Sequence, residues 1–237
     1  MNCVYIHYYN VQGARDIYNE LLSTIQTCDL YENVERLVVN VVGLNYMEEI
    51  KHLQASNPEK IIFTHHRSDD FVNQYKKYNQ HDINKNHRLG VGEHGLEIDT
   101  LDLLHHECVD LADDDCVLYV HLKGAVHKGA HLGSKYQSRE HWRKAMSKHV
   151  ITEWRSRLES IQTNNHEGLH FKAHPKPHYS GNYWWVTAKY IKNNLPVYDM
   201  FMSQRLLRDV NPETTDYLLL ESPYYFGEFW LCNAQIT

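Results

Sequence analysis

The stretch Tyr119 to Gly124 places a histidine, a lysine and a glycine directly after a strongly apolar run. Lys123 offers a compact positive charge suited to phosphate, and Gly124 lets backbone N–H groups approach an anion closely. The residues at 127–129, His-Lys-Gly, continue the basic character. The pattern is typical of a cradle for a diphosphate. A basic strand-to-helix turn without a ligand is the alternative that these residues leave open.

A second stretch, from His174 to Trp185, combines the residue types that bind sugars. Two prolines stiffen its approach, and a tight Ser-Gly-Asn turn at 180–182 follows. Aromatic rings pack against the C–H faces of a sugar, while hydroxyl and amide groups hydrogen-bond to its hydroxyls. Adjacent strand residues point to opposite faces, so we expect one of Trp184 and Trp185 in the core and one outside it.

Glu228 supplies a candidate general base. It lies near the start of an apolar helix, where the helix dipole favours a carboxylate, and it could deprotonate a sugar hydroxyl. Glu221, directly after the apolar run 217–220, is the rival carboxylate. A helix-start glutamate without a catalytic role is the alternative.

The histidines and aspartates do not assemble into a metal site from their spacing. The run Asp113–Asp115 matches a D-x-D pattern, but it precedes a strand and therefore lies at the amino end of the sheet. The histidine pairs at 65–66 and 105–106 cannot both face one metal, because adjacent residues diverge, and we place the second pair on a helix surface. Prolines within 170–178 exclude the helix that would align the three histidines there.

These residues must be positioned by alternating strands and helices. Apolar, β-branched runs predict strands at 3–9, 35–43, 61–65 and 116–122. Helical spacing of apolar residues predicts helices at 17–25, at 46–54, from 96 onward with Val109 on its apolar face, and at 136–161. The later segments are expected as a loop at 166–182, a strand entering a short helix at 184–196, a strand at 217–220 and a final helix.

This order predicts an α/β fold with a mainly parallel sheet and helices on both faces. Ligands of such sheets bind outside the carboxyl ends of the strands. We therefore expect the residues that border the ligand to be Tyr8, Tyr9, His65, His66 and those at 121–124. The polar stretch 66–95 is expected to be an active-site loop.

Composition narrows the class of protein. The 237 residues carry a net charge of -6 with neutral histidines, which argues against nucleic-acid binding. Five scattered cysteines without a C-x-x-C pair favour a reducing compartment. The first residues do not read as a signal peptide, and apolar runs fall short of the roughly 20 residues of a membrane span. We expect a cytoplasmic protein, in a host cytoplasm if viral.

Together these motifs resemble the small GT-A glycosyltransferases of large algal viruses and their bacterial relatives. The most specific pieces are H-x-K-G and S-G-N-x-W-W, and the resemblance covers nearly the whole chain. The segments that carry it are His121–Gly124, Trp142–Met146, His178–Trp185, Tyr190-Ile191 with Leu195-Pro196, and Glu228–Trp230.

The resemblance implies a single GT-A domain over 1–237, Rossmann-like in the manner of nucleotide-diphospho-sugar transferases. It implies a hexosyl- or pentosyltransferase that moves a sugar from a UDP-sugar to a glycan or glycoprotein-glycan acceptor. Where the family carries D-x-D, this chain has His121-Leu122-Lys123, so we expect a weaker need for Mn²⁺ or Mg²⁺. Phe229 stands where an aspartate often follows the acidic position matched by Glu228.

Chemistry, position and resemblance together select three sets of candidate residues. The donor-binding set is Tyr8, Tyr9, His65, His121, Lys123, Gly124 and Arg143. The sugar- or acceptor-binding set is His178, Ser180, Gly181, Asn182, Trp184 and Trp185. The catalytic set is Glu228 and Glu221, with an inverting displacement expected. A carbohydrate-binding module without catalysis and a histidine-rich metal-dependent hydrolase remain the alternative classes.

Overall fold

The computed structural model describes residues 2–67, 97–125, 133–174, 176–197, 199–200 and 223–233. Its centre is a six-stranded sheet in the order β3-β2-β1-β4-β8-β5. The strands are β1 (Asn2–Tyr9), β2 (Arg36–Val42), β3 (Ile61–Thr64), β4 (Cys116–His121), β5 (His166–Gly168) and β8 (Trp184–Thr187). The first four in sequence are parallel, whereas β8 runs antiparallel to both β4 and β5.

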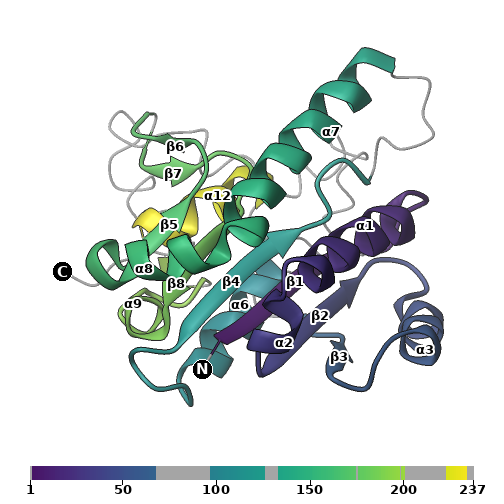
Figure 1. Cartoon of the computed structure of the whole chain (residues 1–237), viewed down its shortest axis with the longest axis horizontal. Helices are drawn as coiled ribbons and strands as arrows, with labels where there is room; N and C mark the ends of the chain where they lie inside the picture. The colour runs from purple at the N-terminus through teal and green to yellow at the C-terminus, as the bar shows by residue number, and fades with distance from the viewer. Residues whose placement is uncertain are drawn as a thin grey trace.

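Helices cover both faces of this sheet (Figure 1). On one face pack α1 (Ala14–Thr27), α2 (Leu30–Asn33), α7 (Gly133–Ser147), the π-helical turn η2 (Lys148–Thr152) and α8 (Trp154–Asn164). On the other face pack α6 (Glu97–Cys108), α9 (Ala188–Lys192) and α12 (Pro223–Asn233). Near the β3 edge lies α3 (Tyr46–Ser56). The predicted α/β class with a mainly parallel sheet is confirmed.

The amphipathic patterns account for the helices on the first face. In α1 the predicted stripe of Ile17, Leu21, Leu22 and Ile25 is buried. The predicted helix over 136–161 is interrupted at η2 and Glu153, yet its apolar stripe still faces the core because the interruption changes the helical repeat only locally.

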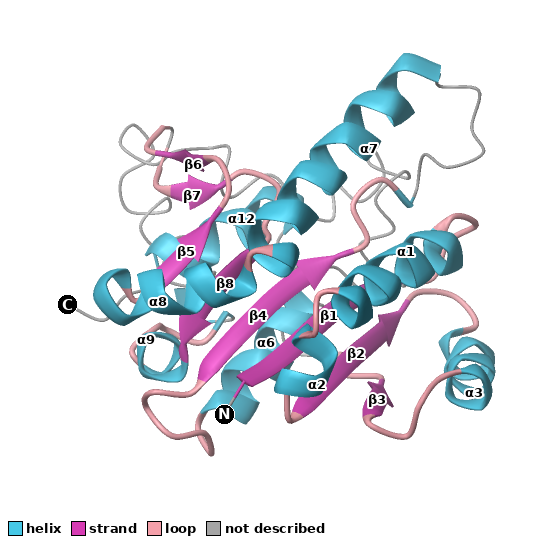
Figure 2. Cartoon of the chain, in the orientation of Figure 1, coloured by secondary structure: helices cyan, strands magenta, loops and turns pink. Residues whose placement is uncertain are grey.

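Two expectations about the fold need correction, and two others concern residues outside the described ranges. The segment 166–182 is not only a loop: it contains β5 and a separate pair, β6 (Phe171–Lys172) with β7 (His178–Tyr179), which Figure 2 shows beside β5. Val109 lies beyond the end of α6 and is 63% exposed, so it is not on the apolar face. The expected strand at 217–220 and nearly all of the expected loop at 66–95 lie outside the described residues.

Within the described ranges, no helix is both long and apolar enough to cross a membrane.

Candidate functional site

A row of buried polar side chains crosses three neighbouring strands near the carboxyl end of the sheet. His7 of β1 is aligned with Asn40 of β2 on one side and with His121 of β4 on the other. Side chains alternate along a strand, so each shares a face with the residue two positions earlier. Those earlier residues pack in the cluster beneath α6: Tyr5, Val38 and Tyr119. The polar row therefore faces α6.

The helix α6 contributes polar side chains that contact this row. Thr100 lies 2.8 Å, through Oγ1, from Nδ1 of His7, and the same oxygen accepts a hydrogen bond from Nδ2 of Asn40 at 3.0 Å. One turn earlier, Oε1 of Glu97 lies 2.5 Å from Nδ1 of His121. Buried polar groups are stable only when they are paired, so these contacts fix α6 against the strand ends.

Glu97 is the centre of the densest part of the site. Its Oε2 accepts hydrogen bonds from Nδ2 of Asn182 at 2.6 Å and from the hydroxyl of Tyr119 at 3.2 Å. Burial raises the pKa of Glu97, but the adjacent His121, His7 and the Asn182 hydrogen bond outweigh burial and lower it to about 2. Glu97 is therefore a carboxylate at neutral pH.

His121 keeps one ring nitrogen available. Its Nδ1 faces Glu97, while its buried Nε2 has no hydrogen-bond partner within the described residues. The hydroxyl of Tyr183 donates to the backbone carbonyl of His121 and holds the strand end in place. A buried ring nitrogen oriented by a carboxylate is suited to binding a polar ligand atom.

Directly after β4, Lys123 lies beside Glu228 of α12. Their Nζ and Oε1 atoms are 3.6 Å apart, and both side chains are mostly buried. The next residue toward the amino end of α12, Gly227, accepts a hydrogen bond through its carbonyl from Nδ2 of Asn182 at 3.3 Å. A Cβ at Gly227 would lie 3.4 Å from Cβ of Glu97, an ordinary van der Waals contact, so α12 and α6 are close neighbours here. The structure thus places Lys123 beside Glu228, and Asn182 against Glu97 and the backbone of α12.

The turn after β4 is supported by Arg143 of α7, a residue that was predicted to bind the donor. Gly124 has φ +91°, a conformation that favours glycine. Arg143 is buried, donates to the carbonyl of Lys123 at 3.1 Å and forms an ion pair with Glu20 of α1 at 2.8 Å. These contacts make Arg143 a brace for the turn, and its predicted donor-binding role stays a prediction.

The Ser-Gly-Asn turn is held against α7. Gly181 has φ +94°, and a Cβ there would lie 2.5 Å from Sδ of Met146 and 2.6 Å from Nε1 of Trp142. Only glycine fits, and Asn182 follows it with φ 55°. Ser180, partly exposed, donates its backbone N–H to His170 at 3.2 Å. The turn therefore positions the side-chain amide of Asn182 to donate a hydrogen bond to Glu97.

Neither tryptophan lies outside the core, so that expectation is wrong. Trp184 and Trp185 do point to opposite faces, but helices cover both faces and both rings are fully buried. Trp184 stacks on Tyr119 at 5.0 Å and donates from Nε1 to Oδ1 of Asn182 at 2.6 Å. Trp185 donates to the carbonyl of Val150 at 2.7 Å. Trp184 acts as a support for Asn182.

The other predicted residues are spread around the sheet edge. Tyr8 points into the α1 face and donates to Glu49 at 2.5 Å, whereas Tyr9 is partly exposed. His65 stacks on Tyr46 at 3.5 Å between ring centroids. His178 is buried, with Nδ1 donating to the carbonyl of Lys176 at 2.7 Å. Glu221 lies outside the described residues.

Sequence reasoning missed the central position of Glu97 and the part played by His7, Asn40 and Thr100. A usable signal existed, because acidic residues in the first turn of a helix that follows a long loop face the carboxyl edge of a parallel sheet. The run Asp113–Asp115 is a turn at the amino end of β4, as predicted.

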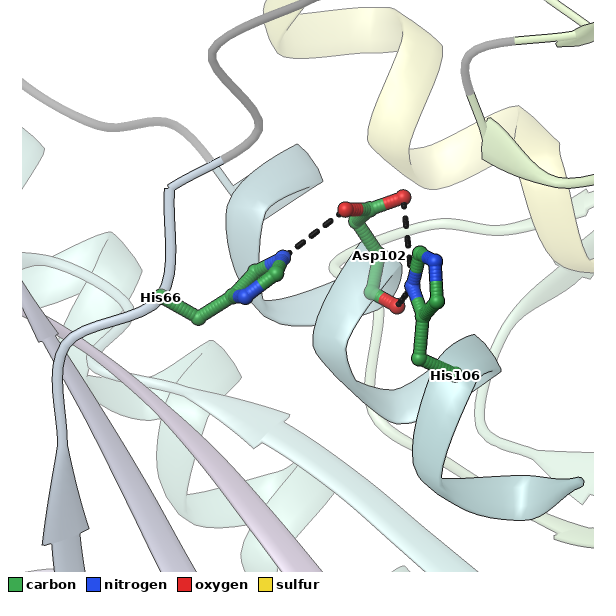
Figure 3. A group of neighbouring side chains, drawn as sticks. All are labelled: His66, Asp102 and His106. Carbon is green, nitrogen blue, oxygen red and sulfur yellow. Dashed lines mark hydrogen bonds and ion pairs between the residues drawn. The ribbon is translucent and has the colours of Figure 1, made fainter.

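A group that could hold a metal lies beside this site. Figure 3 shows His66 and His106 converging on the carboxylate of Asp102. Nε2 of His66 is 2.8 Å from Oδ2 of Asp102, and Nδ1 of His106 is 3.7 Å from Oδ1. We expected that the two histidine pairs could not both face one metal. Here one ring from each pair, His66 and His106, meets Asp102, and one ring from each pair suffices.

The fold and the site define an α/β protein with a polar site at the carboxyl edge of a mainly parallel sheet. The chain belongs to the family described as a domain of unknown function, DUF8361, whose model matches residues 14–229. No curated protein matches it. Among solved structures it is similar to 4-diphosphocytidyl-2C-methyl-D-erythritol synthase from Anaerococcus prevotii. That likeness has 7% identity and a TM-score of 0.39, covers 93% of this chain and 82% of that chain, and carries no argument about function.

Proposed function

We propose that the protein is a glycosyltransferase of the GT-A type that moves a sugar from a nucleotide diphosphate, preferably a UDP-sugar, to a glycan acceptor. The observation that carries the proposal is the meeting of Lys123 and Glu228, 3.6 Å apart, at the carboxyl end of β4. This is the edge at which ligands of α/β sheets bind. A phosphate-binding cation and a candidate base in one place match the two needs of this transfer.

Each group has a defined task in the reaction. The acceptor hydroxyl oxygen attacks the anomeric carbon, the bond from that carbon to the diphosphate oxygen breaks, and Glu228 takes the hydroxyl proton. Lys123 stabilises the charge that develops on the leaving diphosphate. Its flexible stem lets the ammonium group move from Glu228 to the diphosphate. A single displacement of this kind inverts the anomeric configuration.

The surrounding residues support the same reaction. Glu97 holds His121 with Nε2 directed away from the carboxylate, and Asn182 links Glu97 to the backbone of α12. We assign Tyr9 to the border of the nucleotide base, because it is partly exposed at the end of β1. His121 and Lys123 stand where carboxylates would hold a cation, so we propose that added Mn²⁺ or Mg²⁺ has a weak effect on turnover.

Nucleotide binding provides the first test. Isothermal titration with UDP should give saturable binding to the wild-type protein, weakened roughly ten- to a hundredfold in Lys123→Ala, as expected for a charge-assisted contact of about 1.5–3 kcal/mol. Lys144→Ala is the matched control, because Lys144 is an exposed lysine paired with Glu140 on the surface of α7. Equal UDP affinity in the two variants would refute the role of Lys123. Glycan binding without UDP binding would support a carbohydrate-binding module.

Turnover then separates binding from chemistry. Glu228→Gln keeps the shape of the side chain and should bind UDP normally, while turnover falls roughly 10²–10⁴-fold, the usual contribution of a positioned base. Normal turnover in this variant, with loss of turnover in Glu221→Gln, would assign the base to Glu221. A product that retains the donor's anomeric configuration would refute the single displacement.

A further inference from the structure

We infer that His66, Asp102 and His106 form a binding site for a divalent transition metal, with Zn²⁺ as the best-fitting ion. The proposal does not depend on the transfer reaction. Its starting point is the convergence of two separate elements: His66 follows β3, whereas Asp102 and His106 lie on successive turns of α6 (Figure 3). The ligand atoms of the three side chains lie within 4.8 Å of one another.

The spacing is close to that of a zinc site. Zinc bonds of about 2.0–2.1 Å in a tetrahedron place ligand atoms roughly 3.3 Å apart. The measured separations from the Asp102 carboxylate are 2.8 Å to His66 and 3.7 Å to His106. These two contacts would need shifts of about half an ångström to reach zinc spacing, and the ligand atoms of His66 and His106, which lie within 4.8 Å of each other, would have to approach by up to about 1.5 Å.

The surrounding contacts orient the ligands before any metal binds. Asn40, fully buried, accepts from the backbone N–H of His66 at 2.7 Å and donates to its carbonyl at 3.2 Å. Nδ1 of His106 lies 2.8 Å from the backbone carbonyl of Asp102, which sets the ring against the carboxylate, and a Zn²⁺ ion bound through Nδ1 would replace this contact. Asp102 is nearly buried, whereas His106 is 65% exposed and leaves a path from solvent. Outer contacts of this kind hold metal ligands in position.

The ligand chemistry selects the ion. Two imidazole nitrogens with one carboxylate favour zinc and other late transition metals, whereas Mg²⁺ and Mn²⁺ prefer oxygen ligands. Three protein ligands also leave a fourth position for water or for an anionic ligand.

The site is distinct from the Glu97–His121 pair. Asp102 is five residues after Glu97, which corresponds to about 7.5 Å along α6 and roughly 140° around it. Loss of metal binding can therefore be separated from loss of nucleotide binding.

The test compares two histidine variants, because a chain with 18 histidines will bind some zinc nonspecifically. The full chain is stripped with a chelator and titrated with Zn²⁺ by calorimetry, and with Co²⁺ by visible absorption. The wild type should bind one Zn²⁺ tightly and show the absorption of four-coordinate Co²⁺. His106→Gln should weaken the tight site at least tenfold, while His52→Gln, at an exposed position on α3, should leave it unchanged.

A second variant guards against a folding artefact. Asp102→Asn keeps the size of the side chain, and far-UV circular dichroism checks that the protein is folded. Zn²⁺ should raise the melting temperature of the wild type and of His52→Gln, but not of His106→Gln or Asp102→Asn, because a ligand stabilises only the form that binds it. Equal zinc affinity in His106→Gln and His52→Gln would overturn the proposal. So would wild-type binding that is only weak and multi-site, or absent.

Discussion

The helices α1 and α6 cover opposite faces of one sheet but bury different kinds of residue. The buried positions of α1 are Ala14, Ile17, Tyr18, Leu21, Leu22 and Ile25. Those of α6 include Asp99, Thr100 and Asp102 among its apolar residues. The α1 face is therefore held mainly by apolar packing, whereas the α6 face also depends on hydrogen bonds and ion pairs made in the dry interior.

This difference indicates which face of the sheet can carry a functional site. Sheet residues such as Ile6 and Val39, which face α1, meet hydrocarbon, and Tyr8 near the carboxyl edge is an exception that donates to Glu49. A sheet residue that faces α6 near the carboxyl edge meets a polar partner, as His7 and His121 do. Burial among paired polar groups shifts pKa values, and shifted pKa values are typical of functional sites. Substitutions on the two faces should consequently have different effects.

The largest effect is expected for Glu97→Gln on the α6 face. Replacing the carboxylate disturbs three buried contacts at once, with His121, Asn182 and Tyr119, and unsatisfied buried polar groups of this kind cost about 3–5 kcal/mol in total. We expect the free energy of unfolding, measured with urea, to fall by that amount. Glu48→Gln, at an exposed position in the first turn of α3, is the matched control and should change it little. If both variants are equally stable, the Glu97–His121 pair does not hold the α6 face.

Next in size is Leu21→Ala on the α1 face. The change removes a buried side chain from an apolar cluster, and we expect a loss of about 2–5 kcal/mol of stability from lost burial and the cavity left behind. UDP affinity should stay at the wild-type value, because the site lies across the sheet. Ser23→Ala, at an exposed position of the same helix, should alter neither quantity. A loss of UDP affinity in folded Leu21→Ala would show that the two faces are not separable.

The smallest effect is a pH dependence that originates at His7. Burial lowers the pKa of His7 to about 4, an effect that Glu97 reduces and His121 adds to. The unfolded chain, with an ordinary value near 6.5, therefore takes up the proton first. Stability should fall by up to about 3 kcal/mol as pH drops from 6.5 to 4, and His7 should contribute no further loss below that range.

Urea unfolding of the wild type and of His7→Gln across this range measures the effect. The variant should lose less stability than the wild type as the pH falls. His52→Gln, on the surface of α3, should keep the wild-type pH dependence. Parallel curves for the wild type and His7→Gln would contradict the assignment.

The elements of the α1 face could be predicted because their signals are local. The spacing of Ile17, Leu21 and Ile25 within one helix is visible in a short window, and so are the apolar runs of the parallel strands. The α6 face could not be predicted in the same way. His66 meets Asp102 across 36 positions and Asn182 meets Glu97 across 85, so spacing along the chain does not reveal either contact.

The two tryptophans show the same limit. Alternation correctly separates Trp184 from Trp185, but whether a face is covered depends on helices from distant parts of the chain. Lys123 was selected from residue type and its place after a strand, and Glu228 from residue type and its place in a helix, and the structure puts their side chains 3.6 Å apart. Arg143, in contrast, was assigned by motif alone, and its partners Glu20 and the Lys123 carbonyl show a bracing role.

The residues His121, His7 and Asn40 are aligned across three strands. Their alignment also helps to fix the register in which these strands pair. Slipping one strand by a single residue would turn its polar side chain toward the hydrocarbon of α1 and bring an apolar one against Thr100 or Glu97. Such a mispaired chain would lose core packing and polar pairing at once. The residues that form the polar row thereby penalise the wrong sheet, so the candidate site and the right topology form in the same event.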